Sequence, residues 1–558
     1  MNDEALPPAV TTLNADGTPA VPAARSSGPR AGFIGGVIAL IVLAAVGSVL
    51  AWRLVMGSPY SAAEAVPSDA DIVLTIDFAQ LRDLERVDRF IQAFAAPMAR
   101  HGIIDDVPDL ENAMREIDDV AEEELGFRFA EESLAWIGRS AAVAIWVPDD
   151  LLDPAAAVEL DAPPPLLVTV DIRDGDAASA FLDRMLAEAV SAGGNVVDLA
   201  IDGTAAHEVV FDDGALTLVA AIDGDRFVVA DTVATMRRSL SVEDGNSVAQ
   251  VDDFQELAGA LGDGPLMTWY LSDGLGERMA TTYRNLGVAA VEADAAFRAA
   301  MAGVVLDDHG VLLRSATFVD QDATAAGPGD WSRDLPGETY AFLSLLVPER
   351  FLSDAADALL ETVAGAEPGA GAQTELIASV DDLLGVSLLD ELLPQFGREL
   401  LLAVMPTTES QEVPGVLLGI GLADPTPVET ALRHLTGSLQ GEIEIRVEDG
   451  TTIFELDPSF SLAASVTEDA LFVSLGSTAL NRFEAGAGGV TESESYRRTD
   501  TQTIGDGLVL YAHVGGLVAD FADDPVVADI LRPLEAVGVG AEVQGDIEIS
   551  EMRVLVDY

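Results

Sequence analysis

Three kinds of side chain in this sequence could do chemistry: acidic residues at turns, five histidines, and arginines at matched positions. The strongest candidate metal site is a turn with the carboxylates Asp171, Asp174 and Asp176, because Ca²⁺ binds through oxygen ligands. The turn lacks the D-x-D-x-D-G spacing and the bidentate glutamate of an EF-hand loop. A similar turn further along the chain keeps only Asp424 of the three acids. A helix capped by Asp174 is therefore the favoured interpretation, with calcium as the alternative.

The remaining chemistry-bearing residues form no recognisable catalytic set. No histidine belongs to an H-E-x-x-H motif or to another close ligand pair, and no G-x-S-x-G elbow is present. We interpret the histidines as surface or capping residues, and we expect no catalytic residue, no cofactor and no metal. The five histidines are His101, His207, His309, His434 and His513.

Four arginines stand at positions that match between two parts of the chain: Arg139 with Arg398, and Arg237 with Arg482. One hypothesis is that they contact an anionic group or a partner protein. The alternative is pairing with nearby carboxylates, which the acidic surroundings favour.

The composition excludes several classes of protein. The 558 residues include 95 Asp plus Glu and 29 Lys plus Arg, for a formal net charge of −66. There is no lysine and no cysteine, so P-loop, Schiff-base, thiol and disulfide chemistry are excluded. So negative a chain repels nucleic acid. The excess of acids predicts adaptation to high salt, with the codon bias of a GC-rich genome as the alternative.

Residues 31–52 are uncharged and predict a transmembrane helix, because about 20 apolar residues cross a bilayer. We interpret them as an uncleaved signal anchor. Residues 1–30 read as a disordered cytoplasmic tail and residues 53–65 as a stalk. Arg25 and Arg30 precede the span and one arginine follows it, which favours a cytoplasmic N-terminus. The acidic remainder would then be an ectodomain outside the cell membrane.

Gly32 and Gly36 form a G-x-x-x-G motif within this segment. The motif could pack two spans into a homodimer. The alternative is that small residues are simply frequent in this chain.

The sequence of the ectodomain predicts an internal duplication. Residues 66–320 form the first repeat, residues 321–334 a linker and residues 335–558 the second repeat. Four blocks recur in the same order, at an offset that falls from 269 to about 245 residues along the chain. The matched blocks are 66–81 with 335–350, 126–146 with 385–405, 164–186 with 414–436, and 226–239 with 470–483.

The blocks predict an α+β fold of two tandem units, each a mainly antiparallel sheet with helices on one face. In the second block we expect a helix that ends at Gly138, or at Gly397 in the other copy, with glycine as a left-handed C-cap. Asp-Gly pairs between apolar runs predict hairpins, including those that end each unit at 304–318 and 541–556.

This plan resembles an uncharacterised bacterial family, the domain of unknown function DUF3352. The resemblance covers roughly residues 60–558 and rests on VPSDADIVLTID, SLAWIGRSAAVAIW, LLVTVDIRDGDAASAFLDRM and LLPQFGRELLLAVMP. It implies a membrane-anchored envelope protein and supplies neither an activity nor site residues.

Three functions remain open at this point. The first is a non-enzymatic protein of envelope interaction or maintenance, with an unknown envelope protein as partner. The second is a carrier or sensor of an apolar ligand such as a lipid. The apolar helices 84–98 and 352–364 could line its cavity, although packing of these helices in the core is the favoured alternative. The third is a hydrolase that uses scattered carboxylates.

Overall fold

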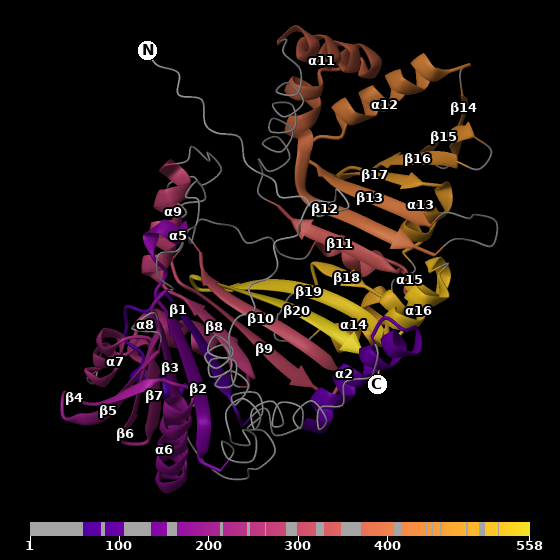
Figure 1. Ribbon diagram of the computed structural model, residues 1–558. Coiled ribbons are helices and arrows are strands. Elements are labelled where there is room, and N and C mark those ends of the chain that lie inside the picture. Colours follow the sequence, from indigo (N-terminus) through magenta and orange to yellow (C-terminus); the bar gives the residue numbers. More distant parts are fainter. Residues whose placement is uncertain are drawn as a thin grey trace, which may run out of the picture.

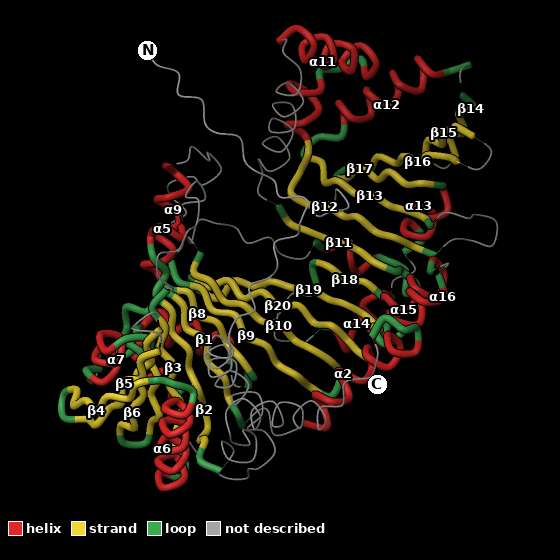
Figure 2. The backbone as a smooth tube through the Cα atoms, in the orientation of Figure 1, coloured by secondary structure: helices red, strands yellow, loops and turns green. Residues whose placement is uncertain are grey.

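The chain folds as a mainly antiparallel α+β protein, as the sequence predicts, but its strands form one large sheet and not a separate sheet in each of two units (Figures 1 and 2). The computed structural model describes the residue ranges 60–79, 84–104, 135–152, 164–211, 216–242, 246–262, 264–285, 298–319, 329–347, 370–406, 414–441, 443–448, 450–457, 460–486, 489–500, 508–522 and 524–557. The part up to residue 319 is called the first half, and the part from residue 329 the second half.

The first half contributes ten strands and the helices between them. Its strands are β1 (Ile72–Asp77), β2 (Ile137–Ile145), β3 (Leu166–Ile172), β4 (Asn195–Ile201), β5 (Thr204–Phe211), β6 (Leu216–Asp223), β7 (Arg226–Ala230), β8 (Met267–Leu271), β9 (Ala300–Asp307) and β10 (Gly310–Phe318). Its helices are η2 (Ser61–Ala65), α2 (Leu84–Arg100), α5 (Asp149–Leu152), α6 (Gly175–Ser191), α7 (Val233–Leu240), η5 (Val248–Gln250), α8 (Asp252–Leu261) and α9 (Asp273–Asn285).

The second half also contributes ten strands. They are β11 (Ala341–Leu346), β12 (Phe396–Met405), β13 (Gly415–Leu422), β14 (Glu444–Glu448), β15 (Thr451–Asp457), β16 (Phe460–Val466), β17 (Ala470–Leu475), β18 (Leu510–Ala512), β19 (Leu534–Gln544) and β20 (Ile547–Val556). The helices are η6 (Asp330–Asp334), α11 (Ala370–Leu384), η7 (Leu388–Leu392), η8 (Leu393–Gln395), α12 (Thr426–Leu439), α13 (Ser477–Glu484), η9 (Val490–Glu492), α14 (Glu494–Thr499), α15 (Val514–Phe521) and α16 (Pro525–Leu531).

Strands pair in the same order in the two halves. The first half has the order β4-β5-β6-β7-β3-β2-β1-β8-β9-β10. The second half has the order β14-β15-β16-β17-β13-β12-β11-β18-β19-β20. Strands β10 and β20 pair with each other and join both halves into one sheet, as the middle of Figure 1 shows.

The two faces of the sheet differ in burial. The buried face carries Val73 and Leu167 in the first half and Leu401 and Leu417 in the second. Helices α7 and α8 pack on it in the first half, and α13 and α14 in the second. The opposite, half-buried face is covered near one end by α6 and near the other by α12. The prediction of helices on one face is therefore wrong, because strands of this sheet are apolar on both sides and both sides need cover.

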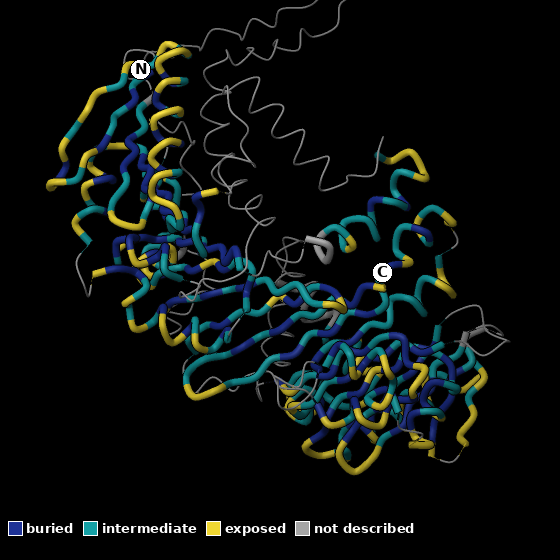
Figure 3. Tube along the Cα trace, turned by 90° about the horizontal axis from the view of Figure 1, so that it is seen from below, coloured by how far each residue is buried: buried dark blue, intermediate teal, exposed yellow. Residues whose placement is uncertain are grey.

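Side chains alternate between these faces along each central strand. In β11 and in the first part of β19, buried residues alternate with partly exposed ones. Figure 3 shows the central strands in dark blue and teal, with yellow exposed residues gathered on the turns and helices around them. The alternation follows from the two-residue period of a strand.

Gly138 and Gly397 do not cap helices, which corrects the sequence-based prediction. Both lie inside strands, Gly138 in β2 and Gly397 in β12, each at an irregularity in the strand register. A Cβ atom on Gly138 would come within 2.7 Å of the Cβ of Asp171, and one on Gly397 within 3.0 Å of the backbone of Gly421. Glycine is required here for the close approach of two strands and not for a left-handed turn.

The residues expected to form a stalk and a linker end in short helices that pack against the sheet. Ala62 and Ala63 of η2 are fully buried, and Ser332 of η6 is nearly so. Residues 60–65 therefore pack on the sheet, which corrects the stalk prediction for them, because the small side chains of Ala62, Ala63 and Ala65 are buried there.

Most of the predicted hairpins and the predicted helix cap are confirmed. Adjacent antiparallel strands form at β9–β10, β19–β20, β6–β7 and β14–β15. The side chain of Asp174 caps α6 by accepting a hydrogen bond from the N–H of Ala177. These signals succeed because turn and cap chemistry depends on a few neighbouring residues.

Several predictions fall on residues that the structure does not describe. These are the tail 1–30, the span 31–52 with Gly32 and Gly36, and helix 352–364. Among the described residues, no helix is both long enough and apolar enough to cross a bilayer.

Candidate functional site: an apolar row and a slot beneath helix α12

The aspartates of the candidate metal turn make separate protein contacts. Asp171 accepts hydrogen bonds from the Ser61 hydroxyl and from the N–H and hydroxyl of Ser140, at 3.0 and 2.9 Å for the latter two. Asp174 caps α6, and Asp176 is exposed in the first turn of that helix. Within the described ranges, no three His, Asp or Glu side chains gather in a way that could hold a metal ion.

Asp171 joins η2 to the sheet. Burial raises the pKa of its carboxyl group, although the hydrogen bonds from Ser61 and Ser140 and the charge of Arg226 act in the opposite direction. Ser140 also accepts a hydrogen bond from the N–H of Ala62, at 2.9 Å. The carboxylate thus fixes η2 against β2 and β3.

Glu399 in β12 has a similar structural role in the second half, although its matched position in the first half is Ser140 and not Asp171. Its carboxylate accepts a hydrogen bond of 2.9 Å from the N–H of Trp331, which holds η6 on the sheet. Burial raises the pKa of Glu399, and the nearby charges of Asp330 and Asp469 add to that effect. Sequence reasoning named Asp171 only as a candidate metal ligand and missed Glu399. The available signal was that Ser140 and Glu399 both follow the matched arginines.

The four matched arginines lie on four elements. Arg139 in β2 forms an ion pair of 3.1 Å with Asp77, and Arg482 in α13 lies 3.3 Å from Glu338. Arg398 in β12 donates a hydrogen bond to the Val347 carbonyl at 3.2 Å. Arg237 is exposed on α7. Two of the four therefore pair with carboxylates, as the structural alternative expects.

The histidines also take part in local contacts. His101 lies 3.0 Å from Asp529 of α16, and His207 lies 2.8 Å from Asp198. His434 lies 3.1 Å from the Leu383 carbonyl. Burial opposes ionisation of Asp529, but hydrogen bonds from His101 and Arg100 outweigh it and lower its pKa. The contact between α2 and α16 ties the two halves together beside the sheet.

The feature that stands out is an unbroken row of apolar cross-strand partners on the half-buried face. We call it the apolar row. It crosses fifteen strands through Phe227, Val170, Ala141, Ile76, Met267, Val304, Leu313, Met552, Val539, Leu510, Leu343, Leu402, Leu418, Val473 and Ala464. At about 4.8 Å per strand, the row follows the sheet for roughly 70 Å.

The row is buried at its ends and partly exposed between them, with three exposed leucines. Leu313, Leu402 and Leu418 are 36%, 43% and 39% exposed, whereas Ile76 and Phe227 under α6 are each 2% exposed. Trp269, which pairs with Leu74 beside the row, is 38% exposed. Large apolar side chains that stay accessible along a continuous strip are typical of surfaces that bind something apolar.

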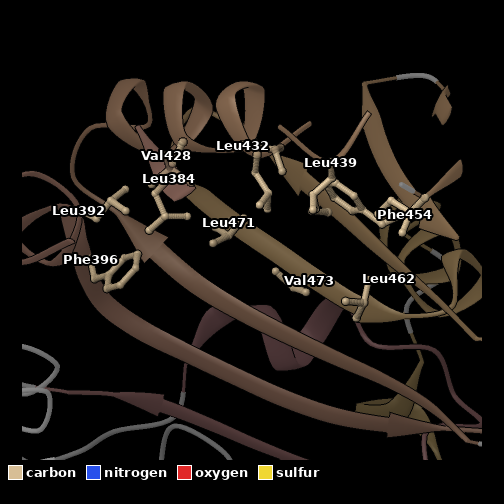
Figure 4. Close-up of a pocket in the computed structure, with 14 residues that line it drawn as sticks. Leu384, Leu392, Phe396, Val428, Leu432, Leu439, Phe454, Leu462, Leu471 and Val473 are labelled. Carbon is tan, nitrogen blue, oxygen red and sulfur yellow. The ribbon is translucent and has the colours of Figure 1, made fainter. Parts of the chain in front are cut away.

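One end of the row leads into an apolar slot beneath α12. The slot has a volume of about 310 Å³, at the lower end of the range for small-molecule sites. Side chains from α12 face strands β16 and β17 across it (Figure 4). Its lining contains no polar side chain: Leu384, Leu392, Phe396, Val428, Ala431, Leu432, Leu435, Leu439, Ile443, Phe454, Leu462, Ala464, Leu471 and Val473.

The slot lies elsewhere than the sequence suggested. The expectation that helix 84–98 lines a cavity finds no support in this slot, whose walls come from α11, α12 and the strands of the second half. The other expected helix, 352–364, lies outside the described residues. The sequence alone did not predict the slot, because its walls come from segments that are far apart along the chain, such as those of Leu384 and Val473.

Comparisons with known proteins give a family and no activity. No curated protein matches the chain. A solved structure, crystal form I of TP0453, is similar over 49% of this chain and 83% of its own, with 10% identity and a TM-score of 0.23. The model of a family described as a protein of unknown function, DUF3352, matches residues 33–454. The match covers most of the sequence, and the chain therefore belongs to the DUF3352 family.

Proposed function

We propose that this protein is a non-enzymatic, membrane-anchored envelope protein whose ectodomain binds the apolar chains of lipids. The observation that carries the proposal is the apolar row with its partly exposed middle and its slot. Among the three functions that the sequence left open, the carrier or sensor of an apolar ligand accounts for the slot as well as for the apolar row.

The energetics favour a hydrocarbon ligand on such a surface. Burial of one CH₂ group stabilises a complex by about 0.8 kcal/mol, so eight methylenes contribute about 6 kcal/mol before the costs of association. The slot offers no polar partner. A ligand that carried a polar group into it would lose hydrogen bonds to water without replacement.

The chemistry of the carboxylates supports a non-enzymatic role. Asp171 and Glu399, two acids whose pKa is raised by burial, both bind backbone N–H groups and hold short helices on the sheet. Raised carboxyl pKa values often mark general acids. Here each group has a structural task, because Asp171 on β3 holds η2 and Glu399 on β12 holds η6 against the sheet.

The proposal extends to topology and origin. Residues 31–52 would anchor the chain with its N-terminus in the cytoplasm and place the acidic remainder outside. The shared strand order of the two halves supports duplication of one unit. The net charge of −66 would suit a medium of high salt, in which mutual repulsion of surface carboxylates is screened.

Quenching of Trp269 fluorescence tests the proposal directly. The full-length chain in nanodiscs is titrated with a nitroxide-labelled lysophosphatidylcholine, whose label quenches nearby indoles. We expect a saturable part of the quenching to disappear in Trp269→Phe, because that indole lies beside the apolar row. It should persist in the matched control Trp331→Phe, whose ring packs against the buried face.

The same titration distinguishes the competing hypotheses. Equal quenching curves for wild type and Trp269→Phe would refute lipid binding at the row. A protein that serves only as a docking partner for another envelope protein would give that result.

A further inference from the structure

The two helices on the half-buried face hold matching positions. Asp174 and Asp424 stand before α6 and α12, and each accepts a hydrogen bond from the N–H of a residue in the first turn. Seven residues after each aspartate comes a buried residue that faces the sheet: Phe181 in α6 and Ala431 in α12. The two helices can therefore be compared position by position.

The space beneath α6 is filled by three aromatic rings. Trp136, Phe181 and Phe227 lie with ring centroids 5.1 to 6.0 Å apart. All three side chains are at least nine-tenths buried. Rings at these distances and angles leave little room between the helix and the strands.

None of the three rings is present at the corresponding positions beneath α12. Leu471 corresponds to Phe227, because Leu471 pairs with Ile420 as Phe227 pairs with Val170. Ala431 corresponds to Phe181. Trp136 corresponds to Gln395, since their carbonyls accept matching hydrogen bonds of 2.7 Å from Arg173 and Ala423.

Two other aromatic residues restore only part of the lost volume. Phe396 stands where the first half has Ile137, and Phe454 where it has Val209. In Figure 4, these two rings lie at opposite ends of the slot. They leave its middle, beneath Leu432, to smaller side chains.

The shape of the slot suits a linear ligand. Its lining follows α12 from Val428 to Leu439, a distance of about 16 Å at the helical rise of 1.5 Å per residue. Leu471 and Val473 form the floor, and Leu418, the partner of Val473 in the apolar row, lies beside them. A chain on the row can thus enter the slot without leaving an apolar surface.

We propose that the slot beneath α12 holds the end of a single acyl chain of a lipid with a neutral or zwitterionic head group, and that the first half has lost this capacity. The inference rests on the proposed function and names its ligand class. A net charge of −66 opposes an anionic head group at low salt.

The experiment fills the slot by restoring what the first half carries. Ala431→Phe places a ring at the position of Phe181, and Leu471→Phe does so at the position of Phe227. The matched control is Ser438→Phe, which adds the same ring to an exposed position of the same helix. The full-length variants in nanodiscs compete octanoyl, decanoyl, dodecanoyl and tetradecanoyl lysophosphatidylcholine against the nitroxide-labelled probe.

For the wild type, we expect affinity to rise about fourfold with each methylene until the slot is full. Ala431→Phe and Leu471→Phe should each lose at least tenfold for dodecanoyl chains and reach a plateau at a shorter chain. Ser438→Phe should match the wild type. The anionic lysophosphatidylglycerol of equal chain length should bind more weakly at low salt and approach the zwitterionic lipid at about 1 M salt.

The outcomes separate the inference from the proposed function. If the wild type binds no chain, both fail. If the wild type binds and both slot-filling variants keep its affinity and chain-length dependence, the slot inference is wrong and the apolar row stands. Thermal melts report folding, and a filled slot should leave the midpoint equal or higher. Should both fillings unfold the protein, Phe181→Ala provides the reverse test, and unchanged lipid stoichiometry in that variant would overturn the inference.

Discussion

Removal of the buried carboxylate at the joint between the two halves should destabilise the whole sheet. Glu551 in β20 is 3% exposed and pairs with Arg314 in β10, whose side chain is 14% exposed. Arg314 also donates a hydrogen bond to the carbonyl of Leu261 at the end of α8. In the variant Glu551→Ala, the buried guanidinium would lose its carboxylate partner.

The expected loss is about 3–5 kcal/mol, because removal of one partner leaves an uncompensated buried charge. With an unfolding entropy of about 2.1 cal/mol/K per residue, a chain of 558 residues has about 1.2 kcal/mol/K. The midpoint of a thermal melt followed by circular dichroism should therefore fall by about 3–4 °C if the sheet unfolds as one unit.

Two further variants show whether burial is the cause. Asp330→Asn removes an ion pair of 3.0 Å with Arg333 whose side chains are 83% and 67% exposed, and it should cost less than about 1 kcal/mol. The double variant Arg314→Met with Glu551→Leu should recover most of the loss, since apolar residues can replace a buried pair. A loss below about 1 kcal/mol for Glu551→Ala would refute the reasoning, because the buried ion pair would then contribute no more to stability than an exposed one.

Three other predictions concern the core, the acids and the charge. Trp136→Ala should cost about 3–5 kcal/mol in urea unfolding, because it empties the aromatic cluster beneath α6; a loss below 1 kcal/mol would mean that the cluster collapses freely. Glu399→Gln keeps an acceptor for the N–H of Trp331. The pKa of Glu399 is raised in the folded state. Protonation of this carboxyl group therefore stabilises the wild type fully below the unfolded pKa of about 4, and this stabilisation is lost as pH rises through the folded pKa. The stability of Glu399→Gln relative to wild type should thus improve from pH 4 to 7, and an opposite trend would contradict the sign of the shift. Molar KCl should raise the melting midpoint by several degrees through screening of the acidic surface, and a midpoint independent of salt would sink the halophilic proposal.

Features set by neighbouring residues could be predicted from the sequence, and features set by distant ones could not. The cap at Asp174 and the hairpin of β9 with β10 each depend on a few adjacent side chains. The residues around Gly138 resemble the C-terminal end of a helix. Glycine is nevertheless needed there because Asp171 on the neighbouring strand leaves no room for a Cβ atom. No local pattern distinguishes a glycine that needs positive φ from one that needs space.

The slot is an intermediate case. The replacement of Phe181 by Ala431 is visible once the matched blocks are aligned, but its meaning depends on Trp136 and Phe227, which reach the same space from other segments. The apolar row was also implicit in the alternation of each strand. Its length was not, because it depends on the pairing of β10 with β20, two hairpin strands that carry no sequence signal for each other.

The pairing of β10 with β20 also removes two long edge strands from this apolar sheet. Taken separately, each half would end in a long exposed edge strand, β10 or β20, which would be open to pairing with another chain. Their mutual pairing over nine residue pairs removes both edges and makes the apolar row continuous across the joint. The outermost strands of the described sheet are β4 and β14, and β14 carries Glu444, Arg446 and Glu448 within five residues. Charges on a short edge strand oppose further pairing. Duplication would thus have doubled the length of the apolar surface while leaving only short strands at the two edges.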